Sequence, residues 1–481
     1  MSKHVPDFSD DIWNRLVQHI YVARGFAPEM IADADIYAAV KETCRILSEG
    51  VDNAIKREVP QELIDHLHDS TFLFSGFKTY HEAREISARL LDTETGSFKT
   101  FDKFYEEVRS IHERYNQNYL RAEYNFAVQS TQMAVRWHKF EQDGDRYQLQ
   151  YRTANDGLVR PEHQALHNTT LPIGDPFWND YTPPLGWNCR CTVVQVRQGK
   201  YPESDSASAI RAGEEATAQP KQQIFRFNPG KTLSVFPPKH PYYKVPEDAA
   251  SMITADTEKK YIDRMMRKMP PNLTDEEKQA LAKHNIELEK QLGIPKGERM
   301  SIDEADKQSA NPNYGKRHFD DNCQTCSPAY MLRLQGFNVT AKACLPGSKS
   351  DYLSKGRSWE VWKNIDGTPA KHTSVNDWMI SKGYKQMSPK RYREFYEESC
   401  AEVGVYQTSI KWKGRGGHAT ILQRLEDGSL LYIEPQIDNS SNRSIDYLCN
   451  NGKTSGLTDN RGVMRIDNKL FNTDFIDIFN K

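Results

Sequence analysis

The sequence contains no long apolar run, and this absence argues against several classes of protein. Its first 25 residues include several acids and no continuous apolar core, so a secretory signal peptide is not expected. No segment approaches the ~20 apolar residues that a membrane helix needs. Eight cysteines are too sparse over 481 residues for a disulfide-based fold. The 64 Lys and Arg residues are balanced by 66 Asp and Glu, so no overall basic field attracts nucleic acid.

What the chain does contain is enough apolar sequence for more than one folded unit. Apolar residues make up 37% and charged residues 27%, which is polar for one compact enzyme. At roughly 150 residues per domain, the length accommodates two to four units. The polar stretch between about residues 246 and 312 shows little apolar periodicity. We therefore predict a first module over 1–245, a helical linker over 246–309 and a second domain over 310–481.

The first third of the chain has the periodicity of amphipathic helices. Apolar residues recur every three or four positions over residues 36–55 and again over 101–133. The second stripe predicts one helix of more than 30 residues, roughly 50 Å long. After residue 144 the pattern alternates, so strands are expected at 147–151 and 191–196.

Less regular sequence follows these elements. Residues 198–223 read as a surface helix or linker, and residues 227–243 as an extended arm punctuated by prolines. Thr274 and Glu277 form a capping box for a helix that should end near Gly293.

Two short motifs of the first module contain residue types that bind zinc. The first runs Arg-Pro-Glu-His over residues 160–163, and the second runs Asn-Cys-Arg-Cys over 188–191. Together with His167 they include two histidines and two cysteines. A Cys-x-Cys pair is unusual in such sites, because it needs a tight local turn. On spacing alone we expect Arg160 and His163 to form hydrogen bonds with a loop, and the two cysteine thiols to pack as small apolar groups. Neither a metal nor a cofactor is therefore expected.

This combination resembles the C-terminal signature of the phage Mu F-protein-like head morphogenesis family, the minor head proteins. The positions that carry the resemblance are Arg160, Pro161, His163, Pro183, Asn188, Cys189, Arg190 and Cys191. The likeness covers roughly residues 30–200. It implies a mainly α-helical body with a small α+β head-morphogenesis module. It also implies a structural role beside portal and capsid proteins.

A second pair of cysteines, Cys323 and Cys326, precedes a short segment that ends at Gly336. Ser327 suits a helix N-cap, Pro328 the first helical position and Gly336 the position after the helix. A thiol near a helix N-terminus faces unpaired N–H groups and the positive end of the dipole, which favour the thiolate. A reactive cysteine is therefore expected here.

Two further residues complete a candidate triad. His418 follows two glycines at the start of a predicted strand, and the next strand, residues 429–433, ends at Glu434. Asp427-Gly428 predicts a hairpin between them, which brings His418 and Glu434 onto neighbouring strands. A helix-borne cysteine, a histidine and an acid are the set that a Cys–His–carboxylate triad needs. Cys-x₂-Cys is equally typical of a metal half-site, but no second half follows. Three single cysteines are expected to be buried: Cys344, Cys400 and Cys449.

This region resembles the papain-fold toxin domain of bacterial polymorphic toxins, a class assigned to glutamine deamidation. The likeness covers about residues 310–440 and rests on Asn322, Cys323, Cys326, Arg333, Gly336, Gly416, Gly417, His418, Glu434, Pro435 and Gln436. It implies an α+β papain-like domain with Cys323 as nucleophile, His418 as base and Glu434 as orienting acid. Cys326 is the alternative nucleophile. Because the family usually has Asp where Glu434 stands, Asp438 is the alternative acid.

The two likenesses together predict a phage- or prophage-encoded minor head protein that carries a glutamine deamidase, a hydrolase. Its expected partners are portal and capsid proteins, a target protein with a susceptible glutamine, and an immunity protein. It is expected in the virion or the cytoplasm of the producing cell, with the toxin domain delivered into a target cell. Two alternatives stay open: a papain-like cysteine peptidase, and a purely structural head assembly protein.

Overall fold

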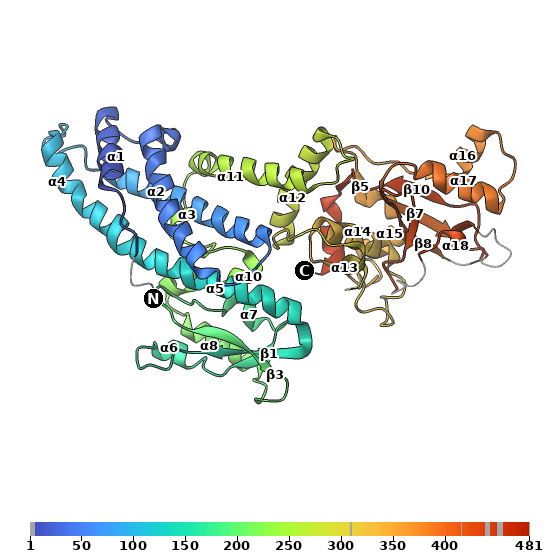
Figure 1. Cartoon of the computed structure of the whole chain (residues 1–481), viewed down its shortest axis with the longest axis horizontal. Helices are drawn as coiled ribbons and strands as arrows, with labels where there is room; N and C mark the ends of the chain where they lie inside the picture. Colours follow the sequence, from blue (N-terminus) through green and yellow to red (C-terminus); the bar gives the residue numbers. More distant parts are fainter. Residues whose placement is uncertain (1–4, 308–309, 415, 438–442, 450–455, 481) are drawn as a thin grey trace. The chain divides into compact units, whose positions relative to one another are not determined.

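The computed structural model describes residues 5–307, 310–414, 416–437, 443–449 and 456–480. It divides into two compact units, Met1–Lys260 and Tyr261–Lys481 (Figure 1). Each unit has its own buried cores, so the predicted multidomain mixture of helices and small sheets is confirmed. The finer division into 1–245, 246–309 and 310–481 stays a prediction. None of the helices in the described ranges has the length and apolar content that a bilayer crossing needs.

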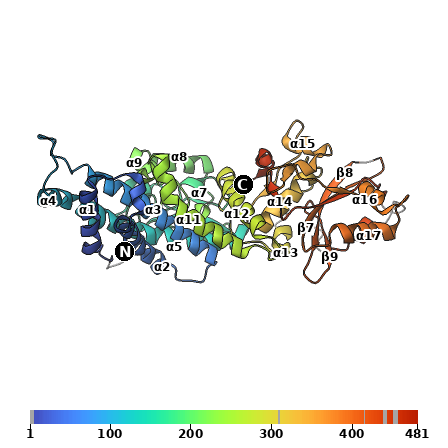
Figure 2. The same ribbon diagram turned by 90° about the horizontal axis from the view of Figure 1, so that it is seen from above.

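Long helices form the body of the first unit. They are α1 (Asp10–Ala23), α2 (Ala34–Ala54), α3 (Gln61–Ser87), α4 (Phe101–His112) and α5 (Leu120–Asp143). Helix α11 (Glu247–Lys268) begins in this unit and continues past its end at Lys260. Helix α2 packs against both α3 and α5 (Figure 2). It confirms the apolar stripe predicted over residues 36–55, since Ile36, Val40, Leu47 and Val51 are all buried.

The long helix predicted from residue 101 is present, with an interruption that periodicity does not reveal. Between α4 and α5 the residues Glu113–Tyr119 form a π-helical turn. In this turn the backbone carbonyl of Tyr115 accepts a hydrogen bond from the buried Lys78 ammonium at 2.8 Å. Asn116 donates to the Glu82 carboxylate at 2.6 Å. The wider turn therefore provides partners for buried charges of α3.

A small module of strands and short helices packs on the other side of α5 (Figure 1). Its strands are β1 (Tyr147–Arg152), β2 (Thr170–Pro172) and β3 (Thr192–Arg197), antiparallel in the order β2-β1-β3. The short helices are α6 (Pro161–Gln164), α7 (Phe177–Asp180), α8 (Ser206–Ala216), α9 (Pro220–Gln223) and α10 (Pro229–Thr232). Trp137 of α5 and Trp178 of α7 are fully buried in its core. The strands predicted at 147–151 and 191–196 are confirmed to within one residue.

The segment expected to be an extended arm is partly helical and packs on the helical body. It contains α10 and a 3₁₀ turn at Pro241–Tyr243. Its apolar residues Phe227, Val235 and Phe236 belong to the core of the helices. Phe236 stacks on Phe74 of α3 with ring centroids 3.7 Å apart. Burial of this apolar surface therefore fixes the segment to the first unit.

The second unit is an α+β arrangement around a five-stranded sheet. The sheet order is β6 (Thr373–Ser374), β10 (Gly462–Arg465), β7 (Gly404–Lys411), β8 (Gly417–Arg424) and β9 (Leu430–Ile433), antiparallel throughout. Four short strands form two further pairs: β11 (Leu470–Phe471) with β5 (Trp362–Lys363), and β12 (Phe479–Asn480) with β4 (Thr340–Ala341). The helices are α12 (Asp275–Leu292), α13 (Ile302–Lys307), α14 (Cys323–Gln335), α15 (Lys349–Ser354), α16 (Val375–Lys382), α17 (Pro389–Ser399) and α18 (Asp446–Cys449). The capping box of Thr274 and Glu277 and the end at Gly293 are confirmed for α12.

Helices cover both faces of this sheet, as strand alternation requires. Val405, Ile421 and Ile433 face the core that contains α14. Tyr406, Leu422 and other residues of the opposite face pack against α16 and α17. The predicted hairpin of β8 and β9 is confirmed, with Gly428 at a positive φ of 81° in its turn. The assignment of this unit to the papain-like fold stays a prediction.

Candidate functional site

Helix α14 begins five residues earlier than its local sequence suggests. Asn322 is the N-cap and Cys323 the first residue, so Pro328 lies inside the helix. The predicted N-cap at Ser327 was therefore wrong. Tertiary bonds outweigh the local preference, because the buried Asn322 side chain exchanges hydrogen bonds with Asn311 at 3.1 and 3.2 Å. Cys323 consequently lies at the helix N-terminus, where N–H groups have no acceptor within the helix.

The histidine and the acid of the candidate triad are in direct contact. His418 Nε2 lies 2.6 Å from Glu434 Oε2, and their side chains are only 11% and 8% exposed. The same oxygen accepts a hydrogen bond from the Tyr432 hydroxyl at 2.8 Å, while Oε1 accepts from the backbone N–H of Gln436 at 3.2 Å. Three bonds hold the carboxylate, which in turn fixes the imidazole and leaves its Nδ1 for another partner.

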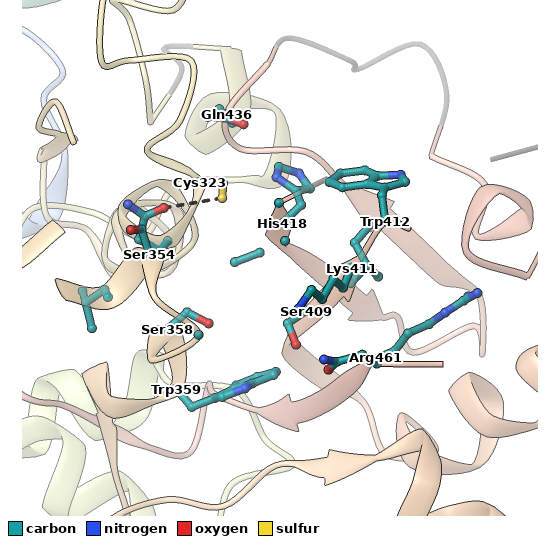
Figure 3. A pocket seen from close by; sticks show the side chains of 18 of the residues that line it. Cys323, Ser354, Ser358, Trp359, Ser409, Lys411, Trp412, His418, Gln436 and Arg461 are labelled. Atoms are coloured by element: carbon teal, nitrogen blue, oxygen red, sulfur yellow. Dashed lines mark hydrogen bonds between the residues drawn. The ribbon is translucent and has the colours of Figure 1, made fainter. Parts of the chain in front are cut away.

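Cys323 and His418 line the same cleft, which has a volume of about 1710 Å³ (Figure 3). Burial lowers the pKa of His418, but hydrogen bonds to Cys323 and Glu434, reinforced by their charges, raise it well above its ordinary value. The imidazolium is therefore favoured beside the sulfur. An adjacent cation of this kind stabilises a thiolate relative to the thiol.

The alternative nucleophile, Cys326, lies on the core side of α14. It is fully buried, and its thiol donates to Asn322 Oδ1 at 3.3 Å. Burial, with smaller contributions from the charges of Cys323 and Glu434, raises the pKa of Cys326 well above its ordinary value. A buried neutral thiol is a weak nucleophile, so the geometry favours Cys323. The alternative acid, Asp438, lies outside the described residues. The three single cysteines are buried as predicted: Cys344, Cys400 and Cys449.

Some of the residues that hold the triad were not singled out from the sequence. Tyr432 had an available signal, because it precedes Glu434 by two positions and so shares its face of the strand. Asn311 had none, whereas Asn322 and Gln436 are among the positions that carry the toxin-domain resemblance. Asn311 Nδ2 donates to the carbonyl of Gln436, 125 positions away, at 3.3 Å, and Gln436 Nε2 donates to Asn322 Oδ1 at 3.3 Å. This amide cluster, Asn311, Asn322 and Gln436, joins the start of α14 to the segment after β9.

Aromatic and basic side chains line the remainder of the cleft (Figure 3). Trp359 stacks on His372 with ring centroids 4.5 Å apart, and Trp412 lies 5.9 Å from the His418 ring. Lys411 and Arg461 also reach the cleft. Such a wide opening admits a loop of a protein more readily than it encloses a small metabolite.

In the first unit, the two short motifs converge on one small region. Arg160 donates to the backbone carbonyl that precedes Asn188 at 2.8 Å, and Arg190 pairs with Asp156. Asn188 itself has a left-handed backbone, with φ of 58°, and its side chain accepts from Asn125 of α5 at 3.3 Å. These bonds connect the loop that precedes β3 with the loop that follows β1 and with the long helix.

His163 lies against both cysteines of the second motif. Its Nδ1 is 3.6 Å from Cys189 Sγ and 3.8 Å from Cys191 Sγ, and the three atoms lie within 4.8 Å of one another. A hydrogen bond between the two thiols lowers the pKa of Cys189 and raises that of Cys191. His167 is not part of this cluster, because its Nδ1 accepts from the backbone N–H and the hydroxyl of Thr153 at 3.1 and 2.8 Å.

This region is the part of the chain that known proteins share. Residues 94–194 match the family Phage Mu protein F like protein. The chain is 41% identical over 81 residues to the capsid assembly protein F described for Escherichia phage Mu, which covers 17% of this chain and 18% of that protein. It is 39% identical over 62 residues to the Mu-like prophage FluMu F protein of Haemophilus influenzae, which covers 11% and 15%. The chain thus spans less than a fifth of the length of either relative. No solved structure matches it significantly.

The matched residues, here called the Mu F-like segment, contain all six motif residues predicted for the head module: Arg160, His163, Asn188, Cys189, Arg190 and Cys191. The predicted resemblance of the first module is therefore confirmed over this segment. The match ends before the second unit begins. The toxin-domain resemblance of residues 310–440 stays a prediction.

Proposed function

We propose that this chain is a minor head protein of a phage or prophage whose second unit is a thiol hydrolase that deamidates glutamine in a target protein. The Mu F-like segment supports the first half, since it is shared with a protein described as a capsid assembly protein. Portal and capsid proteins are then its partners. The second half rests on one observation: Cys323 at a helix N-terminus and the His418–Glu434 pair line one cleft.

The chemistry follows from the roles of these three groups. The Cys323 thiolate attacks the carboxamide carbon of a glutamine side chain and forms a tetrahedral intermediate. His418 donates its proton to the departing nitrogen, so that ammonia leaves and a thioester remains. His418 then removes a proton from water, which attacks the thioester and restores the thiol as the carboxylate of glutamate departs. Glu434 stabilises the imidazolium and does not itself change protonation.

The beginning of α14 also supports such a reaction. Developing negative charge on the carbonyl oxygen needs donors that are already oriented. The first N–H groups of an α-helix have no acceptor within the helix, and the nucleophile is itself the first residue of α14. An attacked carbonyl near the Cys323 sulfur would therefore receive hydrogen bonds without rearrangement of the backbone.

The test compares the full chain with matched cysteine variants in a cell lysate prepared in water enriched with heavy oxygen. A deamidase converts particular glutamines to glutamates that carry the label, and leaves the peptide backbone intact. Cys323→Ala should abolish this labelling, and Cys400→Ala, a change at a buried cysteine of the same unit, should retain it.

Other outcomes identify the alternatives. New labelled C-termini that depend on Cys323 would make the unit a cysteine peptidase, including cleavage within its own head portion. Identical peptide maps for the parent chain and Cys323→Ala would contradict catalysis and leave a structural protein. Delivery into a target cell and an immunity protein follow only if the enzyme is toxic.

A further inference from the structure

The three donor atoms of His163, Cys189 and Cys191 already have the spacing of a metal coordination sphere. Tetrahedral zinc with Zn–S distances of about 2.3 Å and Zn–N of about 2.0 Å places sulfur and nitrogen about 3.5 Å apart. The structure has 3.6 and 3.8 Å between Nδ1 and the two sulfurs. The agreement lies within the few tenths of an ångström by which a site adjusts when it binds an ion.

The surroundings of the cluster also suit a metal better than a set of neutral groups. Cys189 and His163 are buried, at 3% and 2% exposure. Within the described part of the chain, His163 Nε2 has no hydrogen-bond partner, so the polar contacts of this buried ring are the two thiols. Thiols are weak donors and compensate poorly for burying an imidazole. A metal ion bound at Nδ1 would supply a much stronger interaction.

The local backbone removes the objection that a Cys-x-Cys pair needs an unusual turn. Asn188 adopts the left-handed conformation directly before Cys189, and the Cys189 N–H donates to the carbonyl of Gly186 at 3.1 Å. This turn aims both sulfurs at α6. The expectation of a metal-free loop rested on the spacing of the residues, and spacing does not show the backbone conformation of Asn188 or the direction of the two thiols.

We propose that His163, Cys189 and Cys191 bind one zinc ion that fastens α6 to the beginning of β3. The fourth position is open to water or to the Tyr151 hydroxyl, which is buried beside Cys191 on β1. The role is structural. The module around it has three strands and several short helices, so a cross-link among its loops would add to the stability that its small core provides.

The first experiment measures the metal in the full chain, purified under reducing conditions without chelator. The proposal predicts about one zinc per chain, bound by two sulfurs and one nitrogen in X-ray absorption, and a thermal midpoint that falls on chelation and recovers when zinc is returned. Less than about 0.2 zinc per chain, together with a midpoint that is insensitive to chelator and to added zinc, would overturn it.

Variants then assign the ligands. Cys189→Ser, Cys191→Ser and His163→Gln should each lose most of the zinc. Cys44→Ser and Cys323→Ser should keep it, because neither residue is in the cluster. Cys191→His supplies a replacement ligand, so it should retain metal and a folded midpoint even if the serine variants fail to fold. Full zinc content in Cys189→Ser and Cys191→Ser would refute the assignment. Tyr151→Phe distinguishes the fourth ligand, since it changes the absorption spectrum of the cobalt-substituted chain only if the hydroxyl is bound.

Discussion

The contact of His418 with Glu434 allows a quantitative test of how the site activates Cys323. In Glu434→Gln the side chain keeps its size and an oxygen that accepts from Tyr432, but it loses its charge. Hydrogen bonds to a charged group contribute about 1.5–3 kcal/mol, and this pair is 2.6 Å apart and mostly buried, so it should lie within that range. The substitution should lower the pKa of His418 toward its ordinary value and disfavour the thiolate–imidazolium pair.

The assay is the rate of Cys323 alkylation by iodoacetamide, followed residue by residue by mass spectrometry. At about pH 6 the parent should alkylate Cys323 much faster than the buried cysteines, because Cys323 lines the cleft beside the His418 imidazolium while those thiols are enclosed in the cores. Since about 1.4 kcal/mol is a factor of ten, Glu434→Gln should reduce this rate by about 10- to 100-fold. His418→Ala should remove the selectivity altogether.

Glu426→Gln is the matched control, because Glu426 is an exposed carboxylate in the turn between β8 and β9 and should leave the rate unchanged. An unaltered rate of Cys323 alkylation in Glu434→Gln would refute the view that this carboxylate activates the thiol. Selective labelling of Cys326 would identify that residue as the nucleophile and leave the roles of His418 and Glu434 unchanged.

Three further outcomes are expected. Expression of Tyr261–Lys481 in a susceptible cell should be toxic, whereas the same fragment with Cys323→Ala should fold but be harmless. Equal toxicity of the two fragments would show that the toxicity does not depend on catalysis by Cys323. Limited proteolysis should cut first between about residues 246 and 312, the part of the sequence that contains the boundary between the two units. Early cuts elsewhere would argue against two independently folded units. Lys78→Met should lower the free energy of unfolding by about 3–5 kcal/mol in urea, because it leaves the Glu123 carboxylate buried without its cation. Lys78→Met/Glu123→Leu should recover most of that loss, and an equally unstable double variant would contradict the reasoning.

Features determined by neighbouring residues in the sequence were predictable. The apolar stripe of α2 and the capping box of Thr274 and Glu277 depend on positions three and four apart, and both were found where expected. The turn signal of Asp427-Gly428 likewise predicted the hairpin that brings His418 and Glu434 onto neighbouring strands, but this local signal does not place Cys323 beside them.

Features determined by distant residues were not predictable. The π-helical turn at Glu113–Tyr119 depends on a lysine 37 positions from the carbonyl that it binds. The start of α14 depends on Asn311, which overrides the N-cap preference of Ser327. The arm at 227–243 looked extended because its prolines are a local signal, whereas the buried surface that orders it comes from α3 and α5.

The amide cluster has a consequence for how the chain tolerates substitution. Asn311 and Asn322 each donate to and accept from the other, Asn311 also donates to the backbone carbonyl of Gln436, and the Gln436 side chain donates to Asn322. A leucine at any of the three would orphan donors or acceptors in a space closed to water. Genetic inactivation of this protein should therefore arise at positions that carry no reactive atom as readily as at Cys323. Under the proposed function, a natural variant that keeps Cys323, His418 and Glu434 but has a leucine at position 311 would lack hydrolase activity.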